Sequence, residues 1–223
     1  MKEFRAGYDS AHASIFDKVR AHIEELLRCH GAQPQGAGWN GLEAQQVRYE
    51  QLAKLFDSSP QPFSVNDLGC GYGALLDYLS NEGYDFDYVG YDISPAMIEC
   101  AKELKRGGPA NVRAKFILGS ELLPADYTVA CGVFTMKYDL DNQSWLGYVL
   151  NVLDSIDRAS RLGFAFNMLT KYSDPPLMRE ELYYADPCLL FDHCKRSYSR
   201  NVALLHDYSL YDFTIIVRKI SGK

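Results

Sequence analysis

VNDLGCGYG, residues 65–73, is the stretch of sequence that decides the fold. An apolar run that contains Asp67 leads into a turn with glycines at alternate positions, Gly69, Gly71 and Gly73, and a helical run over 74–79 follows directly. Because glycine has no Cβ, such a turn bends sharply and lets the backbone come close to a ligand. The first N–H groups of the following helix are also free to donate. The stretch therefore predicts a strand, a ligand-binding turn and a helix.

A second acid stands at the end of the next predicted strand. The run DYVGYD, residues 87–92, ends in Asp92. A carboxylate that ends the second strand of such a unit is placed to accept both hydroxyls of a ribose.

Outward from this motif, short apolar runs alternate with helical runs, which is typical of βαβ units and a parallel sheet. Residues 201–206 and 212–219 form two further strands, joined by the short loop DYSLY, so they are antiparallel and the sheet should end in one reversed strand. The apolar spacing before residue 60 predicts two helices that cap the domain. The predicted strands are 64–68, 87–92, 114–118, 126–131 and 161–168, and the predicted helices are 9–30, 42–56, 73–82, 95–106 and 142–158.

The acid, the three glycines and the second acid together resemble the cofactor motifs of the class I S-adenosylmethionine-dependent methyltransferases. The run DISPAMI, residues 92–98, is also similar to that family. The resemblance covers residues 60–170 by motif and strand order and extends to 219 with the reversed strand. It implies an α/β fold, a doubly wound and mostly parallel seven-stranded sheet, with an N-terminal helical cap (1–60) on a catalytic domain (61–223).

The resemblance also implies a cofactor site for S-adenosylmethionine. The glycine turn and Asp67 would hold the methionine portion, Asp92 the ribose, and Ile93 would flank the adenine. Family members often have an acid after the third strand, whereas this chain has Ser120 followed by Glu121. The full expected set is Asp67, Gly69, Cys70, Gly71, Gly73, Asp92, Ile93, Ser120, Glu121, Cys131 and Gly132, the last two beside the reactive sulfonium.

Other nucleotide-binding motifs fit the stretch less well. A nicotinamide enzyme has G-x-G-x-x-G, and here the third glycine comes one residue early. A P-loop needs G-x-x-x-x-G-K-S/T, which the chain lacks. The methyltransferase interpretation is therefore preferred.

The sequence disfavours several classes of methyl acceptor. Methyltransferases acting on adenine or glutamine resemble one another in an Asn/Asp-Pro-Pro-aromatic run after the fourth strand, where this chain has CGVFTMKYD. Catechol-type enzymes have a metal-binding acid at the end of the fourth strand. This chain has no acid at residues 131–134, so we expect no metal. The net charge of −6 disfavours a nucleic acid partner. A small-molecule acceptor is what remains, with an RNA or protein methyltransferase, or a non-catalytic domain of the same fold, as alternatives.

Acceptor residues are expected at the carboxyl ends of the strands. We expect the stretch 171–195, with a helix at 187–195, to cover the site, and the N-terminal segment to form the opposite wall. The candidate substrate residues are Trp39, Arg48, Phe134, Tyr138, Asn167, Tyr184 and Tyr208.

Methyl transfer needs a general base only if the acceptor must lose a proton. His206 and His193 are the candidates by position. The spacing of Cys188, His193 and Cys194 does not converge as zinc ligands do. Methylation of arsenic through Cys131, Cys188 and Cys194 is a further alternative.

The opening of the chain lacks the apolar core of a secretory signal, and no stretch is long and apolar enough to span a membrane. The six cysteines are scattered without a CxxC pair, which favours a cytoplasmic protein with reduced thiols. The oligomeric state is not predicted.

Overall fold

The structure, a computed structural model, describes residues 10–57, 59, 61–105 and 113–219. The first residue of the predicted 9–30 helix and the last residue of the predicted 95–106 helix lie outside the described residues. So do parts of the predicted cap and the last residues of the predicted catalytic domain.

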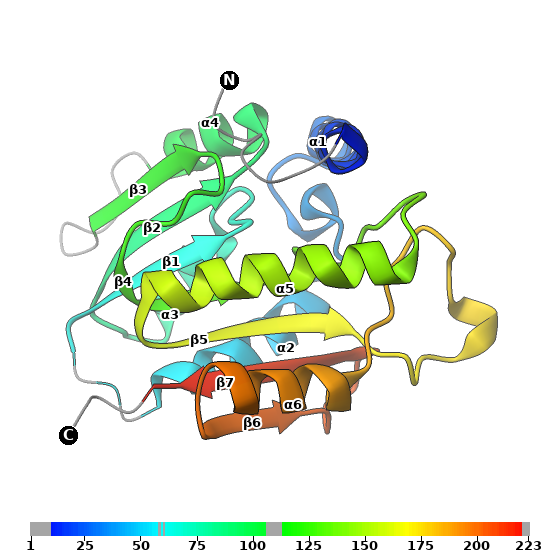
Figure 1. Cartoon of the computed structure of the whole chain (residues 1–223). Coiled ribbons are helices and arrows are strands. Elements are labelled where there is room, and N and C mark those ends of the chain that lie inside the picture. The colour runs from blue at the N-terminus through cyan, green and yellow to red at the C-terminus, as the bar shows by residue number, and fades with distance from the viewer. Residues whose placement is uncertain (1–9, 58, 60, 106–112, 220–223) are drawn as a thin grey trace.

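Seven strands form one sheet in the order β3-β2-β1-β4-β5-β7-β6 (Figure 1). They are β1 (Phe63–Leu68), β2 (Phe86–Asp92), β3 (Arg113–Leu118), β4 (Ala125–Ala130), β5 (Ser160–Leu169), β6 (Asn201–Leu205) and β7 (Asp212–Arg218). Strands β1 to β5 run parallel, whereas β7 is antiparallel to both β5 and β6. The predicted mostly parallel seven-stranded sheet with a reversed last strand is confirmed.

The position of the reversed strand within the sheet differs from the prediction. Strand β7 lies between β5 and β6, and β6 forms the end of the sheet. The helix α6 (Pro187–Ser197) carries the chain from β5 to the outer edge, and the β6–β7 hairpin then brings β7 back into the space left beside β5. The burial of the two strands agrees with this order, because residues 213–217 of β7 are all buried and residues 201–205 of β6 are part-exposed or exposed.

Helices cover both faces of the sheet (Figure 1). The helix α5 (Asn142–Ala159) and α6 share one apolar core with the sheet, and α2 (Leu42–Ala53), α3 (Ala74–Asn81) and α4 (Pro95–Leu104) share the other. Side-chain oxygens cap three of these helices, as expected for Ser and Asp at the N-cap. The caps are Ser94 on α4, Asp141 on α5 and Asp186 on α6.

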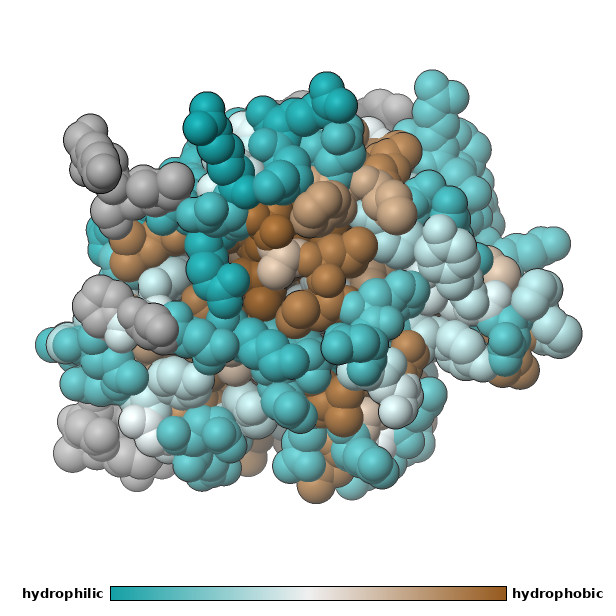
Figure 2. All heavy atoms as spheres, turned by 90° about the horizontal axis from the view of Figure 1, so that it is seen from below, coloured by the Kyte–Doolittle hydropathy of each residue, from teal (hydrophilic) through white to brown (hydrophobic). Residues whose placement is uncertain are grey.

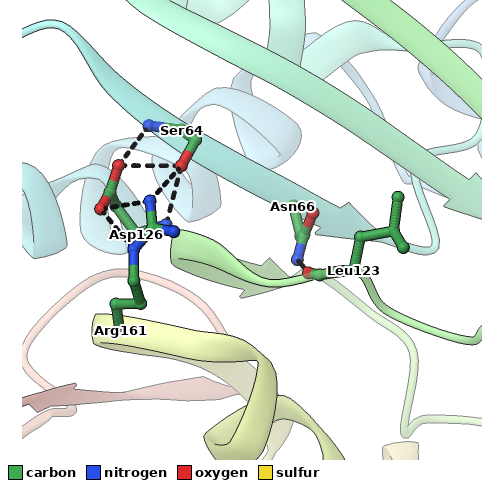
Figure 3. Close-up of polar contacts among 5 residues, drawn as sticks. All are labelled: Ser64, Asn66, Leu123, Asp126 and Arg161. Carbon is green, nitrogen blue, oxygen red and sulfur yellow. Dashed lines mark hydrogen bonds and ion pairs between the residues drawn. The ribbon is translucent and has the colours of Figure 1, made fainter.

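A polar network joins β1, β4 and β5 at their amino ends (Figure 3). The carboxylate of Asp126 accepts from the backbone N–H and hydroxyl of Ser64, both at 2.8 Å, and from Nη2 of Arg161 at 2.9 Å. Nearby, Asn66 Nδ2 donates to the carbonyl of Leu123 at 2.6 Å. The bonds of Asp126 hold β1, β4 and β5 together at the end of the sheet opposite the glycine turn, and the bond of Asn66 ties β1 to the loop before β4.

The N-terminal segment has two parts with different positions. The helix α1 (Ser10–His30) and the short helix η1 (Pro34–Ala37) lie over the carboxyl ends of the strands. The helix α2 and the short helix η2 (Lys54–Phe56) pack on the sheet instead, against β5 and β7. The helix predicted over 42–56 is formed, and its last three residues, 54–56, have 3-10 instead of α geometry.

The lower face of the molecule shows apolar side chains gathered within a mainly hydrophilic surround (Figure 2). This is the side on which β6 ends the sheet in Figure 1, and residues 202–205 of that strand are half-buried.

Among the described helices, none combines the length and apolar character that crossing a bilayer requires.

Candidate active site

The glycine turn is tied to the end of β2. The backbone N–H groups of Gly69 and Cys70 both donate to the carbonyl of Tyr91, at 2.8 and 3.0 Å. Gly69 has φ +77°, and a Cβ there would lie 2.7 Å from the side chain of Val133. Both the backbone angle and the lack of space therefore require glycine at this position.

Asp92 presents both carboxylate oxygens in a fixed orientation. Oδ2 accepts from the Gly71 N–H and Oδ1 from the Ser94 N–H, each at 2.9 Å. Burial raises the pKa of Asp92, and these backbone bonds oppose the rise. Each oxygen of a carboxylate has two acceptor positions. Asp92 therefore keeps the capacity to accept a pair of neighbouring hydroxyls, as a ribose offers.

Asp67, at the end of β1, is also buried. Its Oδ2 accepts from the hydroxyl of Tyr88 at 2.5 Å. Burial raises the pKa of Asp67 to about 7, although the bond from Tyr88 lowers it, and the nearby carboxylate of Asp92 raises it further. A buried acid without a cation beside it is a position where a positively charged ligand group gains most from Coulomb attraction.

One large cavity joins these features. Its volume is about 980 Å³, and it extends over the carboxyl ends of β1, β2 and β4. The helix α1 covers it with the apolar side chains Phe16, Val19, Ile23 and Leu26. A cavity of this size holds a nucleoside-sized ligand together with a second small molecule.

A closed ring of contacts forms the wall of the cavity beyond β4. The Gly132 N–H donates to Asn167 Oδ1, and Asn167 Nδ2 donates to Asp212 Oδ1, both at 2.8 Å. Arg48 Nη2 donates to Asp212 Oδ2 at 2.5 Å, and the guanidinium lies 4.6 Å from the centre of the Trp39 ring. Trp39 completes the ring, because a Cβ on Gly132 would meet its indole at 2.5 Å.

Comparison with known proteins now identifies the family. Rv1506c of Mycobacterium tuberculosis, provisionally named a methyltransferase, is 53% identical to this chain over 165 residues, which are 74% of this chain and 98% of the relative. The family described as "Methyltransferase domain" matches residues 66–155. The chain belongs to the class I S-adenosylmethionine-dependent methyltransferases.

Solved structures with the same fold agree with this membership. The magnesium protoporphyrin IX methyltransferase of Synechocystis PCC 6803 with bound S-adenosylmethionine has a TM-score of 0.64 at 14% identity, covering 96% of this chain and 100% of that one. The N-methyltransferase NodS of Bradyrhizobium japonicum with S-adenosylhomocysteine has a TM-score of 0.62 at 14% identity, covering 89% and 97%. A shorter similarity is to the 18S rRNA (guanine-N(7))-methyltransferase of Bos taurus, 48% identical over 48 residues, which are 22% of this chain and 16% of that protein.

Most of the residues predicted for the site line the methyltransferase's cavity. Gly73 and Asn167 stand behind the lining, and Asn167 acts on it through Gly132. The predicted residues on the lining itself are Trp39, Arg48, Asp67, Gly69, Cys70, Gly71, Asp92, Ile93, Ser120, Cys131, Gly132 and Tyr184.

Four other candidates lie off the lining. Glu121 is exposed to solvent, and Phe134 is fully buried in the core, where its ring packs on Phe166. Tyr138 points toward α1, where its hydroxyl bonds the carbonyl of Lys18. Tyr208 bonds Thr214 through its hydroxyl at 2.9 Å. Position in the sequence places these four near the strand ends, but packing turns their side chains elsewhere.

Neither candidate base is on the cavity wall. His206 is exposed and packs edge-on against Phe213. His193 lies on α6 and its Nε2 is 3.1 Å from the hydroxyl of Tyr198. The helix α6 packs on β6 and β7, so it does not cover the site as predicted for the stretch 171–195. The loop before it does reach the cavity, through Ser173, Leu177, Arg179, Leu182 and Tyr184.

The cysteines proposed for arsenic do not converge. Cys131 lines the cavity, whereas Cys188 and Cys194 both lie on α6, Cys188 exposed and Cys194 buried in the core. Burial raises the pKa of Cys131 and of Cys194, so neither is a ready thiolate. Within the part of the chain that the structure describes, no three His, Cys, Asp or Glu side chains converge as metal ligands.

Some residues of the site were missed by sequence reasoning. The sequence predicts that the N-terminal segment forms a wall of the site, but it does not single out Phe16, Val19, Ile23 and Leu26, the residues of α1 that line the cavity. Asp212 was missed because it is the first residue of a strand and no motif marks it. Tyr72, Leu122 and Met97 also line the cavity. Only the position of Tyr72 inside the glycine turn was a usable signal.

Proposed function

We propose that this methyltransferase transfers the methyl group of S-adenosylmethionine to a small-molecule acceptor, by in-line displacement and without a metal ion. The observation that carries the proposal is the cavity of about 980 Å³ with two different ends. One end is formed by the glycine turn and Asp92, and the other by the ring of contacts through Trp39 and Arg48.

The residues present fit the cofactor. Asp92 would accept the ribose hydroxyls, since each of its oxygens keeps acceptor capacity beside the bonds from Gly71 and Ser94. Ile93 and Leu122 would flank the adenine, and Asp67 would face the ammonium of the methionine portion. When bound, the cofactor supplies an electrophilic methyl group on a sulfonium.

The chain's own contribution to the reaction is to bind, orient and exclude water. Cys131 and Gly132 follow directly after β4 and would lie beside the sulfonium, and Gly132 is held by Asn167. Because the wall through Arg48 and Asp212 is hydrogen-bonded, it can hold an acceptor in line with the methyl group. Positioning of this kind supplies a large part of the acceleration of a bimolecular step.

Three observations favour a small acceptor over RNA or protein. The helix α1 lies over part of the cavity, which narrows the opening for a macromolecule. The net charge is −6, which gives no general attraction to a phosphate backbone. The neighbours include a methyltransferase named for a porphyrin, whereas the rRNA enzyme matches only 16% of its own length. A cytoplasmic location is part of the proposal, supported by six cysteines that are all free.

Two measurements test the proposal. Calorimetric titration with S-adenosylmethionine and S-adenosylhomocysteine should show binding that Asp92→Ala weakens at least about tenfold, or about 1.4 kcal/mol. Incubation with methyl-labelled cofactor and separate small-molecule, RNA and protein fractions of a cell extract should label the small-molecule fraction. Label in RNA or protein alone would show that the proposed acceptor class is wrong.

A further inference from the structure

The two edge strands of the described sheet, β3 and β6, differ in how they are protected. Within β3, Arg113 and Lys115 are charged and exposed. Strand β6 has the sequence NVALL, with no charge, no proline and no register shift against β7. A charge, a proline or a bulge in an edge strand hinders its pairing with another chain. The β3 edge is therefore protected, whereas the β6 edge is open to a further strand.

Strand β6 is apolar on both of its faces. Val202 and Leu204 pack on the core that α5 and α6 share, and Ala203 and Leu205 pack on the core of the opposite face. All four side chains are only half-buried, since β6 is the last strand of the described sheet. The apolar patch in Figure 2 lies on this side of the molecule. An edge strand of this kind favours a partner strand over water.

The two ends of β6 carry opposite charges. Arg200 directly precedes the strand, and Lys195 of α6 donates to the carbonyl of Arg200, so this end is basic. Asp207 lies two residues beyond the other end, which is acidic. The side chains of Arg200 and Asp207 are exposed, and neither has an ion-pair partner among the described residues, although α6 has the exposed pair Arg196–Asp192 close by. Both charges are therefore free to pair with another chain.

We propose that β6 pairs with β6 of a second copy of this chain, antiparallel and across a two-fold axis, so that the two sheets join into one. A two-fold axis brings the same surface of both copies together. In an antiparallel pair, the start of each strand lies beside the end of the other. Arg200 of each copy then approaches Asp207 of the other copy. A parallel pair would bring like charges together instead, so the charges select the antiparallel direction.

The competing occupant of this edge is an extended segment of a different protein. The charge pattern favours a second copy, because a strand with one basic and one acidic end is complementary to itself in the antiparallel direction. The pairing is also compatible with the candidate active site, since none of residues 200–207 lines the cavity. The inference is therefore independent of the acceptor and of the cofactor.

Sedimentation equilibrium of the full chain over a range of concentrations tests the proposal. The wild type should form a dimer. Arg200→Glu and Asp207→Arg each bring like charges together at both ends of the strand pair, so each variant alone should dimerise at least about tenfold more weakly. A mixture of the two variants should form a heterodimer about as readily as the wild type dimerises, because opposite charges then meet at both ends again.

Arg113→Glu is the matched control, because it reverses an exposed charge at the opposite edge of the sheet, and it should leave dimerisation unchanged. Thermal unfolding establishes that each variant is folded, and the double variant Arg200→Glu/Asp207→Arg, with both charges exchanged, should dimerise like the wild type. A wild-type protein that stays monomeric overturns the proposal and leaves the edge to a different protein. A dimer that neither single variant weakens, or a mixture that associates no better than its components, overturns it as well.

Discussion

Arg48 on α2 and Asp212 at the start of β7 form a buried ion pair, with 2.5 Å between Nη2 and Oδ2 and 164 positions between them in the chain. Their side chains are only 11% and 4% exposed. Asp212 also accepts from Asn167, which holds Gly132, and Arg48 lies over Trp39. One pair therefore connects the N-terminal segment, the end of the sheet and the wall of the cavity.

Removing one member of this pair should cost considerable stability. We expect Arg48→Met to lower the free energy of unfolding by about 3 kcal/mol, because it leaves the carboxylate of Asp212 buried without its cation. Urea denaturation measures the loss. Replacing both members in Arg48→Met/Asp212→Leu should recover part of it. The exposed pair Arg113–Asp87 is the control, and Arg113→Met should change stability by about 0.5 kcal/mol or less. Equal losses in the two single variants would contradict the structural role given to Arg48.

The contact between Trp39 and Gly132 allows a second prediction. Gly132→Ala adds a Cβ that would lie 2.5 Å from the indole, at a residue with φ +72°. We expect the indole to move toward solvent and stability to fall by about 1–2 kcal/mol. Tryptophan emission measures the movement in a Trp145→Phe background, which leaves Trp39 as the reporter. An unchanged emission spectrum would show that Trp39 does not rest on Gly132 in solution.

Much of the fold was predictable because it depends on local patterns. The run at 65–73 specifies a strand, a turn that needs positive φ, and a helix, and the structure forms all three. The predicted ends of the strands lie within one or two residues of the observed ends, because polar or glycine residues mark where an apolar run stops. The place of β7 inside the sheet was not predictable from pairing alone, because a hairpin has the same sequence pattern whichever of its strands lies at the edge.

The residues of the site also differ in how far local sequence predicts their position. Asp67 and Asp92 end strands next to a motif, so their position follows from the chain's local path. Tyr138 and Tyr208 were placed by proximity to strand ends, and their direction depends on packing with Lys18 and Thr214. The ring through Asp212 joins residues far apart in the sequence, and no local signal predicts such contacts.

The histidines provide a third prediction. His206→Ala and His193→Ala should each leave kcat/KM within about threefold of wild type, since neither imidazole lines the cavity. Initial rates with any accepted substrate measure this. A loss of about a hundredfold in kcat for either variant, with the protein folded, would instead establish a general base outside the cavity seen here.

A fourth prediction concerns the pH dependence of stability through Asp67. Burial raises the pKa of Asp67 to about 7, well above its value of 3.8 in an unfolded chain. The folded state therefore keeps a proton that the unfolded state loses, so stability falls as pH rises from about 4 to about 7. Asp67→Asn removes this penalty. The variant should match wild type near pH 4 and exceed it by on the order of 4 kcal/mol at about pH 8.

The same group should make cofactor binding depend on pH in the opposite direction. A ligand ammonium beside Asp67 favours the ionised carboxylate, so affinity for S-adenosylhomocysteine should rise between about pH 5.5 and about pH 8 in wild type, with release of a proton on binding. Tyr49, Tyr88, Cys70 and Cys131 surround Asp67, and burial raises the pKa of each, so they stay neutral over this range. Calorimetry in buffers of different ionisation enthalpy measures the proton. Because Asp92 and the cavity's other groups are the same in both proteins, Asp67→Asn should bind more weakly at high pH and show a flatter profile. A wild-type profile as flat as that of the variant would mean that Asp67 is already ionised in the free protein, and that its buried position is stabilised by a group other than Tyr88.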